Sequence, residues 1–234
     1  MLPVAILAGG LATRLRPITE TIPKALVEVA GVPFICRQLT QLAAQGARTV
    51  VLCLGHLGEM IKAEVGDGSR FGLKVVYSFD GPKPLGTGGA LRQALPFLGR
   101  AFFVLYGDSF LPIDFSSVER AFLASGKDAL MTVLKNGDKW DKSNVLFRDG
   151  AVLEYSKRAP QPEMMYIDYG LGVLSVSALA WQDAGAQFDL AELYHALSLQ
   201  GRLAGYEVHE RFYEIGSFEG LKDTEMYFSG RGEI

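Results

Sequence analysis

The sequence offers few of the residues that build disulfide scaffolds or zinc centres. Two of its 234 residues are cysteines, Cys36 and Cys53, and they stand apart in apolar surroundings without a CxxC motif. The three histidines are dispersed and no HExxH motif is present, so a zinc site is not expected. The cysteines fit buried, reduced thiols, which favours a reducing, cytoplasmic location.

An excess of basic charge and a long apolar run are also missing. Lysine and arginine together number 23 against 26 aspartates and glutamates, which gives a formal net charge of −3. Broad binding to nucleic acid or to an anionic membrane is therefore not expected, and an anion site must be local. The apolar N-terminal stretch has no basic leader and breaks after about seven residues, so we expect neither a signal peptide nor a membrane span.

Several catalytic signatures are absent as well. The sequence contains no GxGxxG, no GxxxxGK[ST] and no GxSxG. These absences disfavour a dinucleotide-binding oxidoreductase, a P-loop ATPase and the usual serine hydrolase.

Short apolar runs alternate with helical patterns in the first half of the chain. This alternation predicts right-handed βαβ crossovers and a Rossmann-like α/β three-layer sandwich with a mainly parallel central sheet. Strands are expected within 3–8, 48–55, 73–79 and 101–109, and helices within 33–46, 56–66, 86–98 and 114–126.

The pattern changes after Gly126. Strand-like runs over 128–135, 143–157 and 166–176 come with a hairpin signal at Asp149-Gly150, and the chain ends in a helix for which Ser217 is the candidate N-cap. Without a long linker or repeat, we predict one domain over residues 1–234, with a nucleotide-binding half, 1–126, and a substrate half, 127–234.

Three unusual segments follow predicted strands or precede a helix. GGLATRLRP (9–17) leaves the first strand, GPKPLGTGG (81–89) precedes a helix, and YGDS (106–109) ends a strand. Ligands of parallel sheets bind beyond the carboxyl ends of the strands, so these segments should converge on one site. Backbone N–H groups beside Arg14, Arg16 and Lys24 favour a polyphosphate ligand. Asp108, at the end of an apolar strand, would suit Mg²⁺.

The chain resembles the sugar-1-phosphate nucleotidyltransferases, or nucleoside-diphosphate-sugar pyrophosphorylases, over essentially its whole length. The resemblance rests on GGLATRLRP, PKALVEVAG, GDGSRFGLKVVYS, PLGTGGAL, YGDS and FYEIGSFEGL in that order and spacing. Within the family, the pattern is most similar to the D-glycero-α-D-manno-heptose 1-phosphate guanylyltransferases, and the N-acetylmuramate 1-phosphate uridylyltransferases look close too.

The resemblance implies the fold of the nucleotide-diphospho-sugar transferases and a reaction between an NTP and a sugar 1-phosphate with Mg²⁺. It implies that Arg14, Lys24 and Asp108 are catalytic. Asp108 and Glu214 would hold the metal. The implied nucleotide-binding residues are Leu7, Ala8, Gly9, Gly10, Thr13, Arg14, Lys24, Gly86, Thr87 and Gly88, and the implied sugar-phosphate-binding residues are Gly107, Asn144, Lys157 and Asp168.

Four positions depart from the family pattern. Ala12 replaces a glycine of the opening motif, so the loop must avoid a positive φ or accept strain. Ser143 stands where a glycine often donates its N–H to the sugar, and Ser156 stands where the pair Glu-Lys is common. Glu214 replaces the usual second metal-binding aspartate.

The sequence leaves the base, the sugar and the choice between monomer and homodimer open. GTP with the heptose 1-phosphate is the first hypothesis. The alternatives are a UTP-dependent uridylyltransferase for N-acetylmuramate or another hexose 1-phosphate, and a regulatory or sensor protein that binds a nucleotide sugar without turning it over. Arg14, Lys24 and Asp108, which a regulatory subunit would be expected to lose, are all present.

Overall fold

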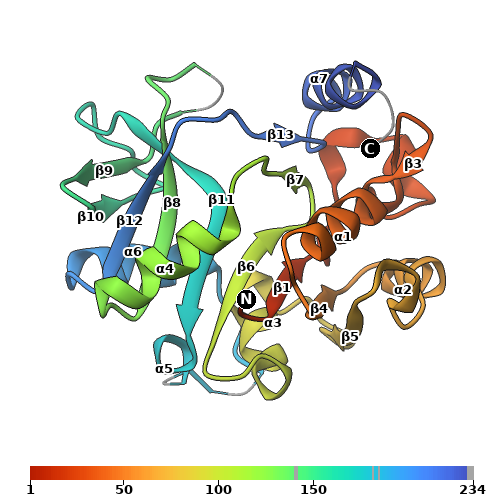
Figure 1. The fold of residues 1–234 in the computed structure, drawn as a ribbon, viewed down its shortest axis with the longest axis horizontal. Coiled ribbons are helices and arrows are strands. Elements are labelled where there is room, and N and C mark those ends of the chain that lie inside the picture. The colour runs from red at the N-terminus through yellow and green to blue at the C-terminus, as the bar shows by residue number, and fades with distance from the viewer. Residues whose placement is uncertain (140–141, 181, 184, 231–234) are drawn as a thin grey trace.

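A computed structural model describes residues 1–139, 142–180, 182–183 and 185–230. Its centre is a nine-stranded sheet in the order β5-β4-β1-β6-β11-β8-β12-β10-β9, which both halves of the chain share (Figure 1). The sheet strands are β1 (Val4–Leu7), β4 (Thr49–Leu54), β5 (Lys74–Phe79), β6 (Ala101–Tyr106), β8 (Ala129–Lys135), β9 (Val145–Arg148), β10 (Ala151–Tyr155), β11 (Tyr166–Ser175) and β12 (Leu203–Val208).

Helices cover both faces of this sheet, as the alternating pattern predicts. One core cluster joins the sheet to α1, α2 and α4, and a second joins its other face to α3, α5 and α6. Successive side chains of β1 point to opposite faces of the sheet, so Val4 and Ile6 belong to the first cluster and Ala5 belongs to the second. The helices are α1 (Phe34–Ala44), α2 (Gly58–Val65), α3 (Gly86–Ala94), α4 (Phe115–Ser125), α5 (Val176–Leu179), α6 (Leu190–Leu199) and α7 (Phe218–Ser229).

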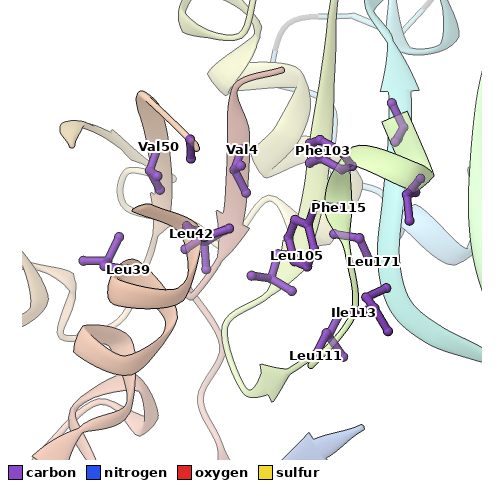
Figure 2. Packing of buried hydrophobic residues seen from close by; sticks show 14 of the residues in the cluster. Val4, Leu39, Leu42, Val50, Phe103, Leu105, Leu111, Ile113, Phe115 and Leu171 are labelled. Atoms are coloured by element: carbon purple, nitrogen blue, oxygen red, sulfur yellow. The ribbon is translucent and has the colours of Figure 1, made fainter. Parts of the chain in front are cut away.

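The first core cluster shows how α1 is fixed against the parallel strands. Leu39 and Leu42 project from α1 toward Val4 of β1 and Val50 of β4 (Figure 2). Farther along the sheet, Phe103 of β6 meets Phe115 of α4 with ring centroids 5.6 Å apart. All six side chains are fully buried, so α1 and α4 pack closely against the sheet.

The expectation of a mainly parallel sheet holds for the first half and is wrong for the second. β5, β4, β1 and β6 run parallel, but β11 pairs antiparallel with both β6 and β8, and β10 pairs antiparallel with β12 and β9. The sheet is therefore mixed. For β9 and β10 the physical reason is a short connection: the hairpin at Asp149-Gly150, where both residues have positive φ as the turn signal requires, can join only antiparallel strands.

Local signals mark several ends of helices correctly. Asp114 caps α4 through the N–H groups of Ser116 and Ser117, and Gly126 ends that helix with a φ of 61°. Ser217 caps α7 by accepting from Gly220 N at 3.0 Å. Across the described residues, we find no helix with the length and apolar character needed to cross a membrane.

Two small ribbons complete the fold. β2 (Glu28–Val29) pairs with β3 (Val32–Pro33), and β7 (Ser109–Phe110) pairs with β13 (Tyr213–Glu214). The second ribbon brings the C-terminal segment and α7 back to the end of β6 (Figure 1). Single-turn 3-10 helices are η1 (Thr13–Leu15), η2 (Ile18–Glu20), η3 (Lys24–Leu26), η4 (Ser69–Phe71) and η5 (Leu95–Phe97).

Candidate active site at the carboxyl ends of the parallel strands

A cleft of about 600 Å³ opens where the four parallel strands end. The three segments singled out in the sequence all reach it, as expected for a sheet of this kind. Its lining comes from the loop after β1, from η3, from the ends of β4, β5 and β6, and from the start of α3. The sequence-predicted residues in this lining are Leu7, Ala8, Gly9, Gly10, Lys24, Gly86, Thr87, Gly107 and Asp108.

The glycines after β1 allow two main chains to approach closely. A Cβ on Gly9 would lie 3.0 Å from Gly55 N, and one on Gly55 would lie 2.7 Å from Gly9 O. Gly10 differs, because a Cβ there would meet no atom within 4 Å. Gly9 therefore serves the packing of strand ends, and Gly10 leaves the backbone open to the cleft.

The next turn is strained at Ala12. Its φ of 49° and ψ of 42° place it in the left-handed region. Of the two outcomes expected for a residue other than glycine here, the loop keeps the positive φ and carries the strain. Its carbonyl accepts from Leu15 N and from Thr19 Oγ1, which fixes the turn ahead of Arg14.

Lys24 and Asp108 form an ion pair across the cleft. Lys24 Nζ lies 2.6 Å from Asp108 Oδ2, and the two side chains are 21% and 25% exposed. Lys24 comes from η3 after the extended Pro23, whereas Asp108 lies in the turn between β6 and β7. Two residues 84 positions apart thus meet at one end of the strands.

Arg14 and Glu214 approach the same place. A Cβ on Gly216 would lie 2.6 Å from Glu214 Oε2 and 3.2 Å from both Arg14 Nη2 and Asp108 Oδ2, so the three groups surround one point. The β7–β13 ribbon brings Glu214 close to Asp108, because Glu214 pairs with Ser109 and Ile215 N donates to Asp108 O at 2.9 Å. Thr13 lies in η1 directly before Arg14 and is exposed.

The Glu214 carboxylate also belongs to the start of α7. It accepts from Ser217 Oγ at 2.6 Å and from Gly216 N, and it packs against Gly220. A carboxylate beside a helix N-terminus is favourable by itself. The geometry is thus compatible with both hypotheses for Glu214, the metal ligand and the helix cap.

The donors at this end of the cleft fit a hard cation. Asp108 and Glu214 supply carboxylate oxygens, the ligands that Mg²⁺ prefers. Within the described ranges, no three His, Cys, Asp or Glu side chains gather as a metal-binding group. Two carboxylates are enough for Mg²⁺ in a phosphate site, because its remaining ligands there are usually water and phosphate oxygens.

The glycines of α3 serve packing more than ligand contact. Gly88 N and Gly89 N both donate to Phe188 O, and a Cβ on Gly88 would overlap the Phe188 ring. Thr87 Oγ1 donates to Asp189 Oδ1 at 3.0 Å and accepts from Leu190 N. Gly86 and Thr87 line the cleft, while Gly88 joins α3 to the segment before α6.

Asn144 and Asp168, the predicted sugar residues, lie together in the second half. Asn144 Oδ1 accepts from Asp168 N at 3.1 Å, and Asp168 Oδ1 accepts from Gly170 N at 3.0 Å. Burial raises the pKa of Asp168 to about 6, although the Gly170 N–H and the charge of Lys157 oppose that rise. Lys157 is exposed and close enough to Asp168 for their charges to interact.

Comparison with known proteins accords with this architecture. Residues 4–144 match the family model described as nucleotidyl transferase. The chain belongs to the nucleotidyl transferase family.

Relatives of this chain differ in their named substrates. The chain is 42% identical over 116 residues to N-acetylmuramate alpha-1-phosphate uridylyltransferase of Neisseria meningitidis serogroup B and 39% identical over 114 residues to D-glycero-alpha-D-manno-heptose 1-phosphate guanylyltransferase of Campylobacter jejuni. These matches cover 48% and 49% of the chain and 49% and 51% of the relatives, so the alignments span about half the length of each.

A solved structure matches over a greater length. The crystal structure of HddC from Yersinia pseudotuberculosis complexed with GMP-PN has a TM-score of 0.83 and 26% identity, and the match covers 97% of this chain and 100% of that one.

The structure adds cleft residues that the sequence motifs did not predict. His56, Asp80 and Tyr106 line it. Each stands near the carboxyl end of a parallel strand, which is the signal that could have identified them. Asp80 Oδ2 accepts from Leu85 N at 3.2 Å, and burial raises the pKa of its carboxyl.

Two departures from the family pattern have clear local roles. Ser143 N donates to Asp138 Oδ1 at 2.7 Å, and Ser143 Oγ accepts from Asp138 N and Asn136 Nδ2. Ser156 N donates to Asn144 O, and Ser156 Oγ accepts from Ala159 N. Both serines therefore fix the segments around Asn144, and the Ser143 N–H is already bonded within its own loop.

Proposed function

We propose that the protein is a sugar-1-phosphate nucleotidyltransferase, which joins the NMP of an NTP to a sugar 1-phosphate and releases pyrophosphate. The observation that carries the proposal is the convergence of three separate segments: Lys24 and Asp108 line the glycine-rich cleft as an ion pair, and the Arg14 guanidinium lies beside Asp108. Such a cluster suits the binding and neutralisation of a triphosphate.

In the proposed reaction, a phosphate oxygen of the sugar 1-phosphate attacks the α-phosphorus of the NTP. A new P–O bond forms as the bond to pyrophosphate breaks in line with it. The protein holds two polyanions in place and neutralises their charge, so Arg14 and Lys24 would bind phosphate oxygens. Mg²⁺, when held by Asp108 and Glu214, would supply further positive charge at those oxygens.

We assign the sugar phosphate to residues of the second half of the chain, which do not line the cleft itself. Lys157 would bind its phosphate, and Asp168 with Asn144 would face the sugar. The arrangement of these residues supports the assignment, because Asp168 N donates a hydrogen bond to Asn144 Oδ1 and Lys157 is close enough for its charge to act on Asp168. The relatives are named for heptose, N-acetylmuramate, glucose and mannose 1-phosphates, so the identity of the sugar is tested separately with a panel of sugar 1-phosphates.

GTP is the nucleotide we favour, and Asp80 supports that choice. Asp80 follows β5 and Asp108 follows β6, and the order β5-β4-β1-β6 separates these strands by three spacings, or about 14 Å. A nucleoside between them would place its base near Asp80. Guanine offers two neighbouring donors, N1–H and N2–H₂, to a carboxylate, whereas uracil offers one donor between two carbonyl acceptors. The full-length match to a structure containing GMP-PN agrees with this choice.

The test is pyrophosphate release from four NTPs, each with a panel of sugar 1-phosphates that includes the heptose and N-acetylmuramate compounds. We expect Mg²⁺-dependent release with GTP preferred, and Asp80→Asn should reduce that preference. Release only with UTP would replace GTP by the uridylyltransferase alternative. Nucleotide binding without any release would favour the regulatory alternative.

Paired variants test the division of the site. Lys157→Ala should raise the KM for the sugar 1-phosphate, whereas Arg14→Ala should raise the KM for the NTP. Arg158→Ala is the matched control, because the Arg158 guanidinium already pairs with Glu192 at 2.5 Å. If Lys157→Ala affected only the NTP, the division would be wrong.

A further inference from the structure

α1 presents a row of glutamines to the segment that carries Asp108. Gln38, Gln41 and Gln45 donate from their side-chain amides to main-chain carbonyls between residues 106 and 113. The spacing of three and four residues puts Gln38 and Gln41 of α1, and Gln45 at its C-cap, on one face of the helix. α1 therefore acts as a hydrogen-bonding partner for a segment of irregular backbone.

Gln38 differs from the other two in what it holds. Its Nε2 donates to Tyr106 O at 2.9 Å and to Ser109 O at 2.8 Å. These two carbonyls flank the turn formed by Gly107 and Asp108. Both protons of one amide are thus used on the two ends of the turn that carries the Asp108 carboxylate.

The surroundings of Gln38 indicate that its two hydrogen bonds do more than stabilise the fold. Its side chain is fully buried, and its Oε1 has no hydrogen-bond partner among the described residues. An unpaired buried carbonyl destabilises the native state. A methionine of similar size would remove that penalty and would fill the space, but it could not hold the two carbonyls.

We propose that Gln38 is a positioning residue for the metal site, because it fixes the Gly107-Asp108 turn so that the Asp108 carboxylate faces Glu214. The other side of the turn is fixed by Ile215 N, which donates to Asp108 O. The turn is thus held between α1 and the β7–β13 ribbon, which also carries Glu214. The inference rests on the proposed function only in its assignment of a metal to these carboxylates.

Gln38→Met is the decisive variant and Gln41→Met is its matched control. Gln41 lies one turn later on the same helix, donates to Leu111 O at 2.6 Å and also has an unpartnered Oε1 within the described part of the chain. It therefore matches Gln38 in chemistry but holds a carbonyl beyond the Asp108 turn. Mn²⁺ without nucleotide is the probe, and its binding is measured by electron paramagnetic resonance.

We expect Gln38→Met to weaken Mn²⁺ binding about tenfold, as for the loss of one or two hydrogen bonds, and Gln41→Met to leave it unchanged. The Mg²⁺ concentration for half-maximal pyrophosphate release should rise similarly, with the KM for the sugar 1-phosphate unchanged. If Gln38→Met does not fold, Gln38→Asn, which is too short to reach both carbonyls, should show the same shift.

Equal Mn²⁺ affinity in wild type and Gln38 variants would overturn the inference, as would equal losses in the Gln38 and Gln41 variants. Wild-type protein that binds no Mn²⁺ would overturn it too. Failure of the proposed function looks different: Mn²⁺ binds and depends on Gln38 and Asp108, but no NTP and sugar 1-phosphate release pyrophosphate.

Discussion

Replacing Asp168 by asparagine should make the protein more stable at neutral pH and change its stability little near pH 4. In the native state, burial raises the pKa of this carboxyl from 3.8 to about 6. The folded protein therefore keeps the Asp168 proton over a pH range in which the unfolded chain has already lost it. By linkage, the free energy of unfolding falls as the pH rises from about 4 to about 6 and is then constant with respect to this group.

The size of the effect follows from the two pKa values. A difference of about two units corresponds to about 3 kcal/mol above pH 6, and partial exposure of the side chain makes this an upper bound. Asparagine has nearly the same shape, keeps an oxygen for the Gly170 N–H and cannot ionise. The variant should therefore gain up to this amount at pH 7.

Urea unfolding followed by circular dichroism at intervals between pH 4 and pH 7.5 measures this difference. Asp114→Asn supplies a control of opposite sign, because hydrogen bonds from Ser117 and Ser116 lower the pKa of Asp114 to about 2. Ionised Asp114 stabilises the protein above pH 4, so its replacement should reduce stability at pH 5. A difference between wild type and Asp168→Asn that stays constant from pH 4 to pH 7 would refute the reasoning.

Two further predictions concern the strained loop and the second carboxylate. Ala12→Gly should raise the free energy of unfolding by about 0.5–1 kcal/mol because it relieves the left-handed φ of 49°, whereas Ala43→Gly, within α1, should lower it by a similar amount. A loss of stability in both variants would contradict the first expectation. Glu214→Gln should reduce Mg²⁺-dependent pyrophosphate release far more than Glu214→Asp if the charge serves the metal. Unchanged turnover in Glu214→Gln with lower thermal stability would instead make Glu214 a helix cap.

Elements whose structure depends on near neighbours could be predicted from the sequence. The alternation of apolar runs and helical patterns predicted the covered, parallel first half, because each strand and helix carries its own periodicity. Asp149-Gly150 predicted a hairpin, and Ser217 predicted the start of α7, since both signals act within four residues. The motifs also predicted that the segments after β1 and β6 would meet at one edge of the sheet, because parallel strands end on the same side.

The tertiary structure alone decided features that depend on distant pairing. The apolar run of β11 would look the same in a parallel or an antiparallel strand, so its insertion between β6 and β8 could not be read from its residues. The β7–β13 ribbon, which brings Glu214 to Asp108, is two residues long on each side and has no periodicity to detect. Gln38 lies on a helix 68 positions before Tyr106, and its hydrogen bonds exist only because α1 packs beside the end of β6. Sequence patterns report local geometry and burial, whereas hydrogen bonds between distant segments depend on how the whole chain packs.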